Sequence, residues 1–343
     1  MTGKTTARAV ITGSKTALLG ESALKHLFIV NPAAGGRDKT EYVRSLAAPL
    51  MARLGQEYEV YTTLAPMDAC DKIRTEANGG ELRVYACGGD GTLNECVNGA
   101  YGLTGVSVTH FPCGTGNDFI KSFQGNEERF SDLEALVLGE THRLDLVSVN
   151  GRMSINICSV GFDARVGGDV HKYSALPLVG GKGGYILSLI VNLIKGICGR
   201  LRINSGDYTF LGDISLVCAC NGSWYGGSFN PMPDAVLDDG FIDFLIVHKL
   251  SRLKFLQLVG KYAAGRYREL GEVITYVRGH RLDLEAEQPI PVNVDGEIIT
   301  ARKLNFEVVP RGLSFILPAG MGYGTDAPAK SGDISSNMEI SAN

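Results

Sequence analysis

The sequence predicts an α/β domain followed by a β-rich domain. Over residues 25–145, short apolar runs alternate with helical segments, a rhythm that is typical of a mostly parallel, wound sheet. Beyond residue 145, closely spaced strand candidates follow one another, which indicates largely antiparallel pairing. The length of 343 residues is about twice that of a typical domain, and a hydrophobic fraction of 44% suffices for two cores.

The first half contains four strand candidates rich in β-branched or aromatic residues. They are residues 26–30, 57–63, 82–87 and 106–111. Helical periodicity occupies the intervals at 38–54, 67–77 and 93–101. We therefore expect four parallel strands with helices packed on the sheet.

The second half contains many short strand candidates and two helical segments, 183–197 and 251–264. The strand candidates are residues 144–149, 153–160, 201–204, 207–211, 214–220, 241–247, 273–277, 281–285, 304–309 and 313–317. The predicted organisation is an extension at 1–24, an α/β domain at 25–145, a β domain at 146–310 and a solvated tail at 319–343. Segment 311–318 is a candidate return to the first domain.

The composition excludes several classes of protein. With 33 basic and 37 acidic residues the formal charge is −4, so a nucleic-acid-binding surface is not expected. No apolar run reaches the roughly 18 to 20 residues that span a bilayer, the longest being Ile186 to Ile194. Lys4, Arg8 and Lys15 interrupt any secretory leader, so we expect a cytoplasmic protein.

Cysteine and histidine follow no catalytic or metal-binding pattern. The eight cysteines contain no C-x-x-C pair, and we expect reduced thiols in the core. The six histidines lie at no catalytic spacing with Ser or Cys, so we expect structural or exposed histidines.

Glycine is abundant, at 44 of 343 residues, and three glycine-rich loops follow strand candidates. The loops are Asn31-Pro-Ala-Ala-Gly-Gly36, Gly88-Gly-Asp-Gly-Thr92 and Pro112-Cys-Gly-Thr-Gly-Asn-Asp118. In a wound sheet all three lie at the carboxyl edge, where ligands bind. Glycine lets backbone N–H groups approach phosphate oxygens. The loops therefore predict a polyphosphate ligand.

Acidic residues in these loops indicate a divalent cation. Asp90 and Asp118 would repel a phosphate unless a cation such as Mg²⁺ lies between them. The alternative is that Gly-Gly-Asp-Gly forms only a tight turn. Neither G-x-x-x-x-G-K-[ST] nor G-x-G-x-x-G after the first strand is present, so the nucleotide must be held in another way.

The three loops together resemble the diacylglycerol kinase catalytic domain, and the chain is most similar to soluble bacterial lipid kinases related to diacylglycerol, sphingosine and ceramide kinases. Asn221 to Gly227, Pro233 to Gly240 and Val294 to Glu297 match further motifs in the family's order. The resemblance covers residues 25–318. The Gly-Gly-Asp-Gly-Thr motif alone is also found in NAD kinases and phosphofructokinases.

The resemblance implies an NAD kinase- or phosphofructokinase-like α/β domain and a C-terminal β-sandwich, with ATP in the cleft between them. The implied ATP contacts are Asn31, Pro32, Ala33, Ala34, Gly35, Thr62, Gly88, Gly89, Asp90, Gly91, Thr92, Leu93, Asn94, Glu95, Gly114, Thr115 and Asn117.

The resemblance also implies two metal sites. Asp90 and Asp118 would belong to an Asp–water–Mg²⁺ network, and Asp239 would hold a structural Mg²⁺ with carbonyls of Val236 and Phe241. Gly116 departs from the pattern, because many relatives have Thr or Ser there.

The segment Val294-Asp-Gly-Glu297 contains the candidate proton acceptors. By resemblance Glu297 is favoured, Asp295 is a second candidate, and sphingosine kinases assign the role to the residue matching Asp90. The alternative is that Asp-Gly only forms a hairpin turn. A turn and a catalytic carboxylate are compatible.

The leading hypothesis is an ATP- and Mg²⁺-dependent lipid kinase that converts diacylglycerol to phosphatidic acid. One alternative is a kinase for NAD or another small molecule, and a second is a non-catalytic, nucleotide-regulated lipid-binding protein. The sequence does not identify the lipid and leaves a homodimer open.

Two segments bear on membrane contact. Six basic and no acidic residues lie between Phe244 and Arg268, which favours peripheral contact with anionic lipids or, alternatively, an ordinary solvated helix face. The apolar stripe from Ile186 to Ile197 is expected to be core or to line an acyl groove.

Overall fold

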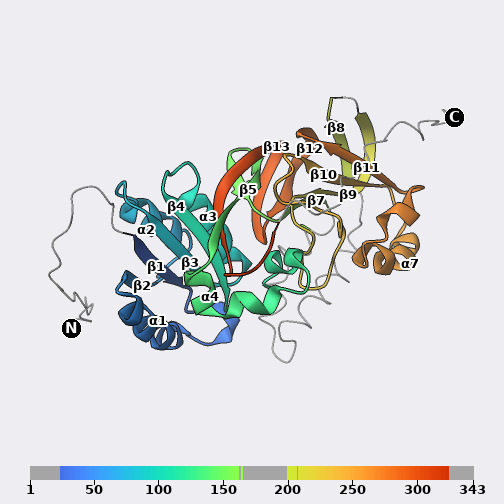
Figure 1. Ribbon diagram of the computed structural model, residues 1–343. Coiled ribbons are helices and arrows are strands. Elements are labelled where there is room, and N and C mark those ends of the chain that lie inside the picture. Colours follow the sequence, from blue (N-terminus) through green and yellow to red (C-terminus); the bar gives the residue numbers. More distant parts are fainter. Residues whose placement is uncertain (1–23, 162–163, 165–198, 207, 324–343) are drawn as a thin grey trace, which may run out of the picture.

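The computed structural model describes residues 24–161, 164, 199–206 and 208–323. Figure 1 shows an α/β half on one side and a β-rich half on the other, with helix α7 (Arg252–Ala263) at the end remote from strands β1 and β2. The predicted helix at 183–197 and the apolar stripe within it lie outside the described residues. Among the described helices, none is long and apolar enough to cross a membrane.

The α/β half contains four parallel strands, as the alternating pattern predicts. They are β1 (Lys25–Val30), β2 (Glu57–Thr62), β3 (Leu82–Gly88) and β4 (Val106–Pro112), in the order β4-β3-β1-β2. β1 and β3 are almost entirely buried, which explains their continuous apolar sequences. Phe28 stacks on Tyr85 with ring centroids 4.4 Å apart at the centre of this core.

Helices connect these strands close to the predicted positions. The longer ones are α1 (Thr40–Leu54), α2 (Asp68–Glu76) and α3 (Asp90–Ala100), followed by the short α4 (Leu133–Val137). Single 3₁₀ turns are η1 (Ala34–Gly36), η2 (Phe119–Phe123) and η3 (Glu127–Ser131). Helix α3 begins at Asp90, three residues before the predicted start, because the Gly-Gly-Asp-Gly-Thr motif itself forms its first turn.

The second half pairs antiparallel, as predicted. Its strands are β5 (Glu140–Val149), β6 (Arg152–Ser154), β7 (Ile157–Gly161), β8 (Gly199–Asn204), β9 (Thr209–Cys220), β10 (Ile242–His248), β11 (Ile274–Gly279), β12 (Arg281–Val294) and β13 (Glu297–Leu317). Helix α7 and the turn η4 (Tyr267–Leu270) pack beside them. The inner faces of seven of these strands enclose one apolar cluster that includes Val147, Phe244 and Phe306.

Strand β13 joins the halves into one sheet. The amino-terminal part of β13 pairs with β12, its later part pairs with β5, and Phe315 pairs in parallel with Val108 of β4. The described strands thus form a continuous 13-stranded sheet. The carboxyl edge of β1–β4 faces the β12–β13 turn as a consequence.

Seven cysteines lie in the described residues, and all seven are buried thiols that form no disulfide, as expected for reduced cysteines of the core. Burial raises the pKa of the thiols for which a shift is resolved, such as Cys87 and Cys96, so these groups stay protonated at neutral pH. Cys198 lies outside the described residues.

Candidate active site

The three glycine-rich loops meet at the carboxyl edge of β1, β3 and β4. The Gly88 carbonyl accepts hydrogen bonds from the backbone N–H groups of Cys113 at 2.8 Å and Gly114 at 3.0 Å. A Cβ built on Gly114 would lie 2.6 Å from the Gly89 Cα, and one built on Gly35 would lie 2.5 Å from the Cys113 carbonyl oxygen. Only glycine permits this close approach, so the loops form one assembly.

His110 stabilises this loop assembly through a hydrogen bond to its backbone. It is fully buried in β4, and its Nε2 donates to the Gly88 carbonyl at 3.1 Å, because a carbonyl can only accept. Burial lowers the pKa of His110, while the Asp90 carboxylate opposes that change. His110 therefore has the expected structural role, because it holds the Gly88 carbonyl of the second glycine-rich loop.

Asp90 occupies the first position of α3 and faces the third loop. Its Oδ1 accepts from the backbone N–H of Asp118 at 2.7 Å and of Phe119 at 3.3 Å. Burial raises the pKa of Asp90; His110 opposes this rise and the Asp118 carboxylate adds to it. A Cβ on Gly116 would lie 2.9 Å from Asp90 Oδ2, so a larger residue at this position would require the Asp90 carboxylate to shift.

Asp118 connects the two halves of the chain. Its Oδ1 lies 2.5 Å from Lys121 Nζ, and its Oδ2 accepts from the backbone N–H of Gly227 at 2.8 Å. Lys121 also donates to the Gly227 carbonyl at 3.0 Å and lies 5.7 Å from the centroid of the Trp224 ring. A cation bound directly to Asp118 would therefore have to displace Lys121 or Gly227.

Asp295 lies in the turn between β12 and β13 and is buried. The turn is a two-residue hairpin in which Asp295 (φ 51°) and Gly296 (φ 95°) are both left-handed, as the Asp-Gly signal predicts. Its carboxylate accepts from Ser154 Oγ at 2.5 Å, from Asn94 Nδ2 at 3.0 Å, and from two backbone N–H groups, those of residues 155 and 156, at 2.8 Å and 3.1 Å. Burial raises the pKa of Asp295, and these donors oppose the rise.

Glu297 lies two residues further on and has different surroundings. It is exposed, at the first position of β13. A Cβ built on Gly91 would lie 3.3 Å from its Oε1, so this carboxylate sits over the first turn of α3. Asp295 in the turn is therefore buried, whereas Glu297 at the start of β13 faces the glycine loops.

The other predicted nucleotide contacts differ in accessibility. Leu93 and Asn94 are buried, whereas Ala33, Gly35 and Thr115 are exposed at the loops. Asn94 donates to Asp295 and to the Met153 carbonyl, so its side chain joins the halves and does not face solvent.

Local hydrogen bonds shape the first and third loops. Asn31 Nδ2 donates to Thr92 Oγ1 at 3.2 Å, which links the first loop to the second. Asn117, with φ 48°, donates to the Gly114 carbonyl at 3.0 Å. Thr62 ends β2, and its hydroxyl lies 3.0 Å from that of Thr40.

The predicted second metal site contains an ion pair. Asp239 Oδ2 lies 2.5 Å from Arg278, and its Oδ1 accepts from the Phe241 N–H at 3.1 Å. Among the described residues, no group of three or more His, Cys, Asp or Glu side chains is placed to hold a metal. The arrangement fits an Arg–carboxylate pair better than Mg²⁺, and the site at Asp239, Val236 and Phe241 stays a prediction.

Three contacts at the site escaped the sequence analysis: Lys121 with Asp118 within the α/β half, Ser154 with Asp295 within the β-rich half, and Gly227 with Asp118 between the halves. Lys121 follows Asp118 by three residues, so its spacing could have indicated the ion pair. Ser154 and Gly227 gave no comparable signal, because their partners lie more than 100 residues away in the chain.

Two family models match this chain. The diacylglycerol kinase catalytic domain matches residues 25–149, and the YegS C-terminal NAD kinase beta sandwich-like domain matches residues 156–317. The two matches follow each other along the chain, and the diacylglycerol kinase catalytic domain among them identifies a kinase. Both the glycine loops and the β12–β13 turn lie within the matched residues, and the enzyme class that these matches support is that of a lipid kinase.

Named relatives agree with these two matches. A protein of Shewanella frigidimarina (strain NCIMB 400), named "Probable lipid kinase YegS-like", is 28% identical over 274 residues, covering 77% of this chain and 87% of that protein. A crystal structure of a diacylglycerol kinase from Bacillus anthracis str. Sterne has a TM-score of 0.63 at 20% identity, covering 87% of this chain and 98% of that one.

A second structure from the same organism has a TM-score of 0.67 at 23% identity, covering 85% of this chain and 97% of that one. At this level of identity, the two structural likenesses show the fold. They extend over both halves of the chain.

Proposed function

We propose that the protein transfers the γ-phosphate of ATP to the hydroxyl of a lipid, with diacylglycerol as the first candidate and phosphatidic acid as its product. The observation that carries this proposal is the position of Glu297. Its carboxylate comes from the β-rich half and lies over the first turn of α3, beside the glycine loops. A phosphate donor and an alcohol acceptor can therefore meet between the loops and Glu297.

The chain's own groups provide the binding and orientation of the phosphates. Backbone N–H groups at the glycine loops and at the start of α3 are suited to anionic oxygens. Mg²⁺, when bound, would neutralise charge on the phosphates, and the Asp90 carboxylate is the oxygen ligand best placed to hold it. Hydrogen bonds from residues 118 and 119 fix the orientation of that carboxylate.

Glu297 is the proposed proton acceptor. The lipid oxygen attacks the γ-phosphorus, the bond from that phosphorus to the bridging oxygen breaks, ADP leaves, and the hydroxyl proton passes to Glu297. General-base assistance of this kind contributes about 10² to 10⁴ in rate. Exposure suits this role, because the carboxylate is accessible to an incoming substrate.

Asp295 has a different proposed role, that of a positioning residue. Its carboxylate ties the β12–β13 turn to α3 through Asn94 and to the end of β6 through Ser154. Because Glu297 is only two residues away, this clamp fixes the direction in which the proposed base points. Asp295, the second candidate for the proton acceptor, is thus proposed to hold Glu297, the first candidate, in position.

The test is a transfer assay with γ-labelled ATP and Mg²⁺. Diacylglycerol, a sphingoid base and NAD are offered separately, the lipids in detergent micelles. Label in phosphatidic acid is the expected result. Label in the NAD product alone would show that the acceptor is a soluble molecule and not a lipid. ATP binding without transfer to any acceptor would favour a non-catalytic role.

A further inference from the structure

Helix α7 is fixed to the β-rich half by its inner face. Phe255 and Leu258 pack against the apolar cluster beneath it, and Tyr262 is buried with its hydroxyl 3.0 Å from Cys218 Sγ. The Ser251 hydroxyl caps the helix by accepting from the Lys254 N–H at 3.2 Å. The helix is therefore held in place, and its outer face has a defined composition.

The outer face of α7 exposes two leucines. The side chains of Leu253 and Leu256 are 68% and 54% exposed. Because successive helical residues are about 100° apart, Leu253 lies on the side opposite Phe255 and Tyr262, with Leu256 next to it. These leucines contribute little to the core of the chain.

Basic residues are frequent in α7 and in the segment that follows it. Residues 252–270 contain five basic side chains against one acidic side chain, Glu269, a surplus of four in a chain whose overall charge is −4. Glu269 is shared by Lys261 and Arg266, and Arg268 pairs with Asp234. No described residue forms an ion pair with Lys254, which is exposed beside Leu253.

We propose that the outer face of α7 docks on an anionic lipid bilayer. Leu253 and Leu256 enter the boundary between headgroups and acyl chains, and Lys254 with the neighbouring basic residues contacts lipid phosphates. This inference rests on the proposed function, because a diacyl lipid substrate lies in a bilayer. Charge complementarity selects an anionic surface, since the leucines alone would not distinguish anionic from neutral lipid.

Matched controls are available elsewhere on the surface. Leu138 and Leu211 are each 53% exposed, close to the value for Leu256, and lie outside α7. Lys303 in β13 has a side chain that is 75% exposed. L138S/L211S and K303E therefore remove the same chemical groups at positions unrelated to the proposed surface.

The experiment is co-sedimentation of the full-length protein with phosphatidylcholine vesicles, with and without phosphatidylglycerol. We expect binding that depends on phosphatidylglycerol. L253S/L256S should weaken it by about tenfold or more, equivalent to about 1.4 kcal/mol, and K254E should weaken it and reduce its salt dependence. L138S/L211S and K303E should bind like the wild type.

Vesicle binding and phosphate transfer are measured separately. The α7 variants should phosphorylate diacylglycerol in detergent micelles at the wild-type rate. Equal vesicle binding by L253S/L256S and the wild type, or an equal loss in the control variants, would overturn docking through α7. Absence of micellar transfer by the wild type would instead reject the proposed function.

Discussion

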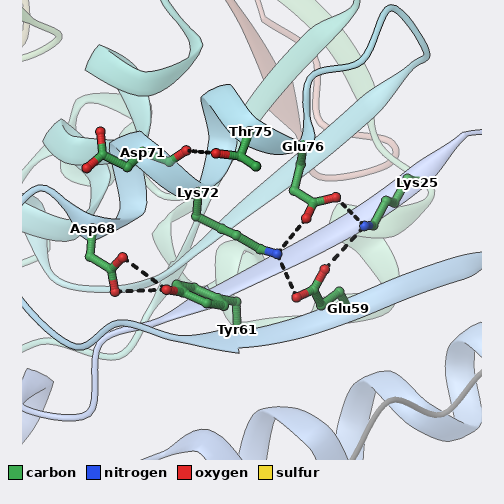
Figure 2. A network of polar contacts seen from close by, with 8 residues as sticks. All are labelled: Lys25, Glu59, Tyr61, Asp68, Asp71, Lys72, Thr75 and Glu76. Atoms are coloured by element: carbon green, nitrogen blue, oxygen red, sulfur yellow. Dashed lines mark hydrogen bonds and ion pairs between the residues drawn. The ribbon is translucent and has the colours of Figure 1, made fainter. Parts of the chain in front are cut away.

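Two polar clusters in the α/β half differ in how their charges are balanced. In the first, Lys25, Glu59, Lys72 and Glu76 alternate in sign, and each lysine contacts both glutamates at 2.6 to 3.2 Å (Figure 2). Burial opposes ionisation here, yet hydrogen bonds from the two lysines lower the pKa of Glu76. The two lysines and the two glutamates therefore neutralise one another.

The second cluster lies at the carboxyl edge and carries excess negative charge. Asp90 and Asp118 lie close together, with Lys121 as the neighbouring cation. Burial raises the pKa of Asp90, and Asp118 adds to that rise. A compensated cluster needs nothing from outside the protein, whereas this one is suited to a bound cation and its phosphate partner.

The largest effect is expected at the proposed base. Glu297→Gln should lower kcat by about 10² to 10⁴, because only proton acceptance is removed. Turnover with γ-labelled ATP and diacylglycerol measures it, with Glu287→Gln, whose side chain is 73% exposed, as the control. Turnover of Glu297→Gln within a few-fold of the wild type would remove this residue as the base.

Replacement of the neighbouring acidic residue, Asp295, should lower the stability of the fold. Asp295→Ala leaves Ser154, Asn94 and two backbone N–H groups without their buried acceptor. The free energy of unfolding should fall by about 3 kcal/mol, measured by urea denaturation. Glu297→Gln should leave it unchanged. An Asp295→Ala variant as stable as the wild type would show that this carboxylate does not clamp the turn.

The smallest effect is expected in the compensated cluster. A double-mutant cycle with Lys72→Met and Glu76→Gln should give a coupling of about 0.2 to 1 kcal/mol, with phosphate transfer unchanged. Because the pKa of Glu76 is lowered in the folded state from its usual 4.5, its stabilisation is present above that value and is lost as pH falls through the folded pKa.

Unfolding at a series of pH values tests this dependence. A Lys72–Glu76 coupling that persists unchanged well below pH 4.5 would contradict the account of this cluster, as would a loss of transfer activity in Lys72→Met.

The sequence predicted the parts of this molecule that local patterns determine. Apolar runs located β1, β3 and β4 because both faces of these strands are largely buried, and β-branched and aromatic residues located the half-buried β2. Asp-Gly located the β12–β13 hairpin because left-handed backbone is needed there. The helix predicted at 93–101 starts three residues too late. The first turn of α3 contains Asp90 and Gly91, which are more typical of loops.

Contacts between distant segments could not be predicted from local patterns. The hydrogen bonds from Asn94 to Asp295 and from Gly227 to Asp118 depend on how β13 joins the two halves. Asp295 and Glu297 look alike in the sequence, and only their surroundings in the folded chain distinguish a buried clamp from an accessible carboxylate.

The central claim is that ATP phosphates bind where the three glycine loops meet. Calorimetric titration with Mg-ATP tests it most directly, using Gly114→Ala, whose Cβ would lie 2.6 Å from the Gly89 Cα, and Gly271→Ala, whose Cβ would meet nothing within 4 Å. We predict binding by the wild type and Gly271→Ala and a weakening of about tenfold or more in Gly114→Ala. Equal affinity in all three proteins, or no heat with the wild type, would contradict the claim.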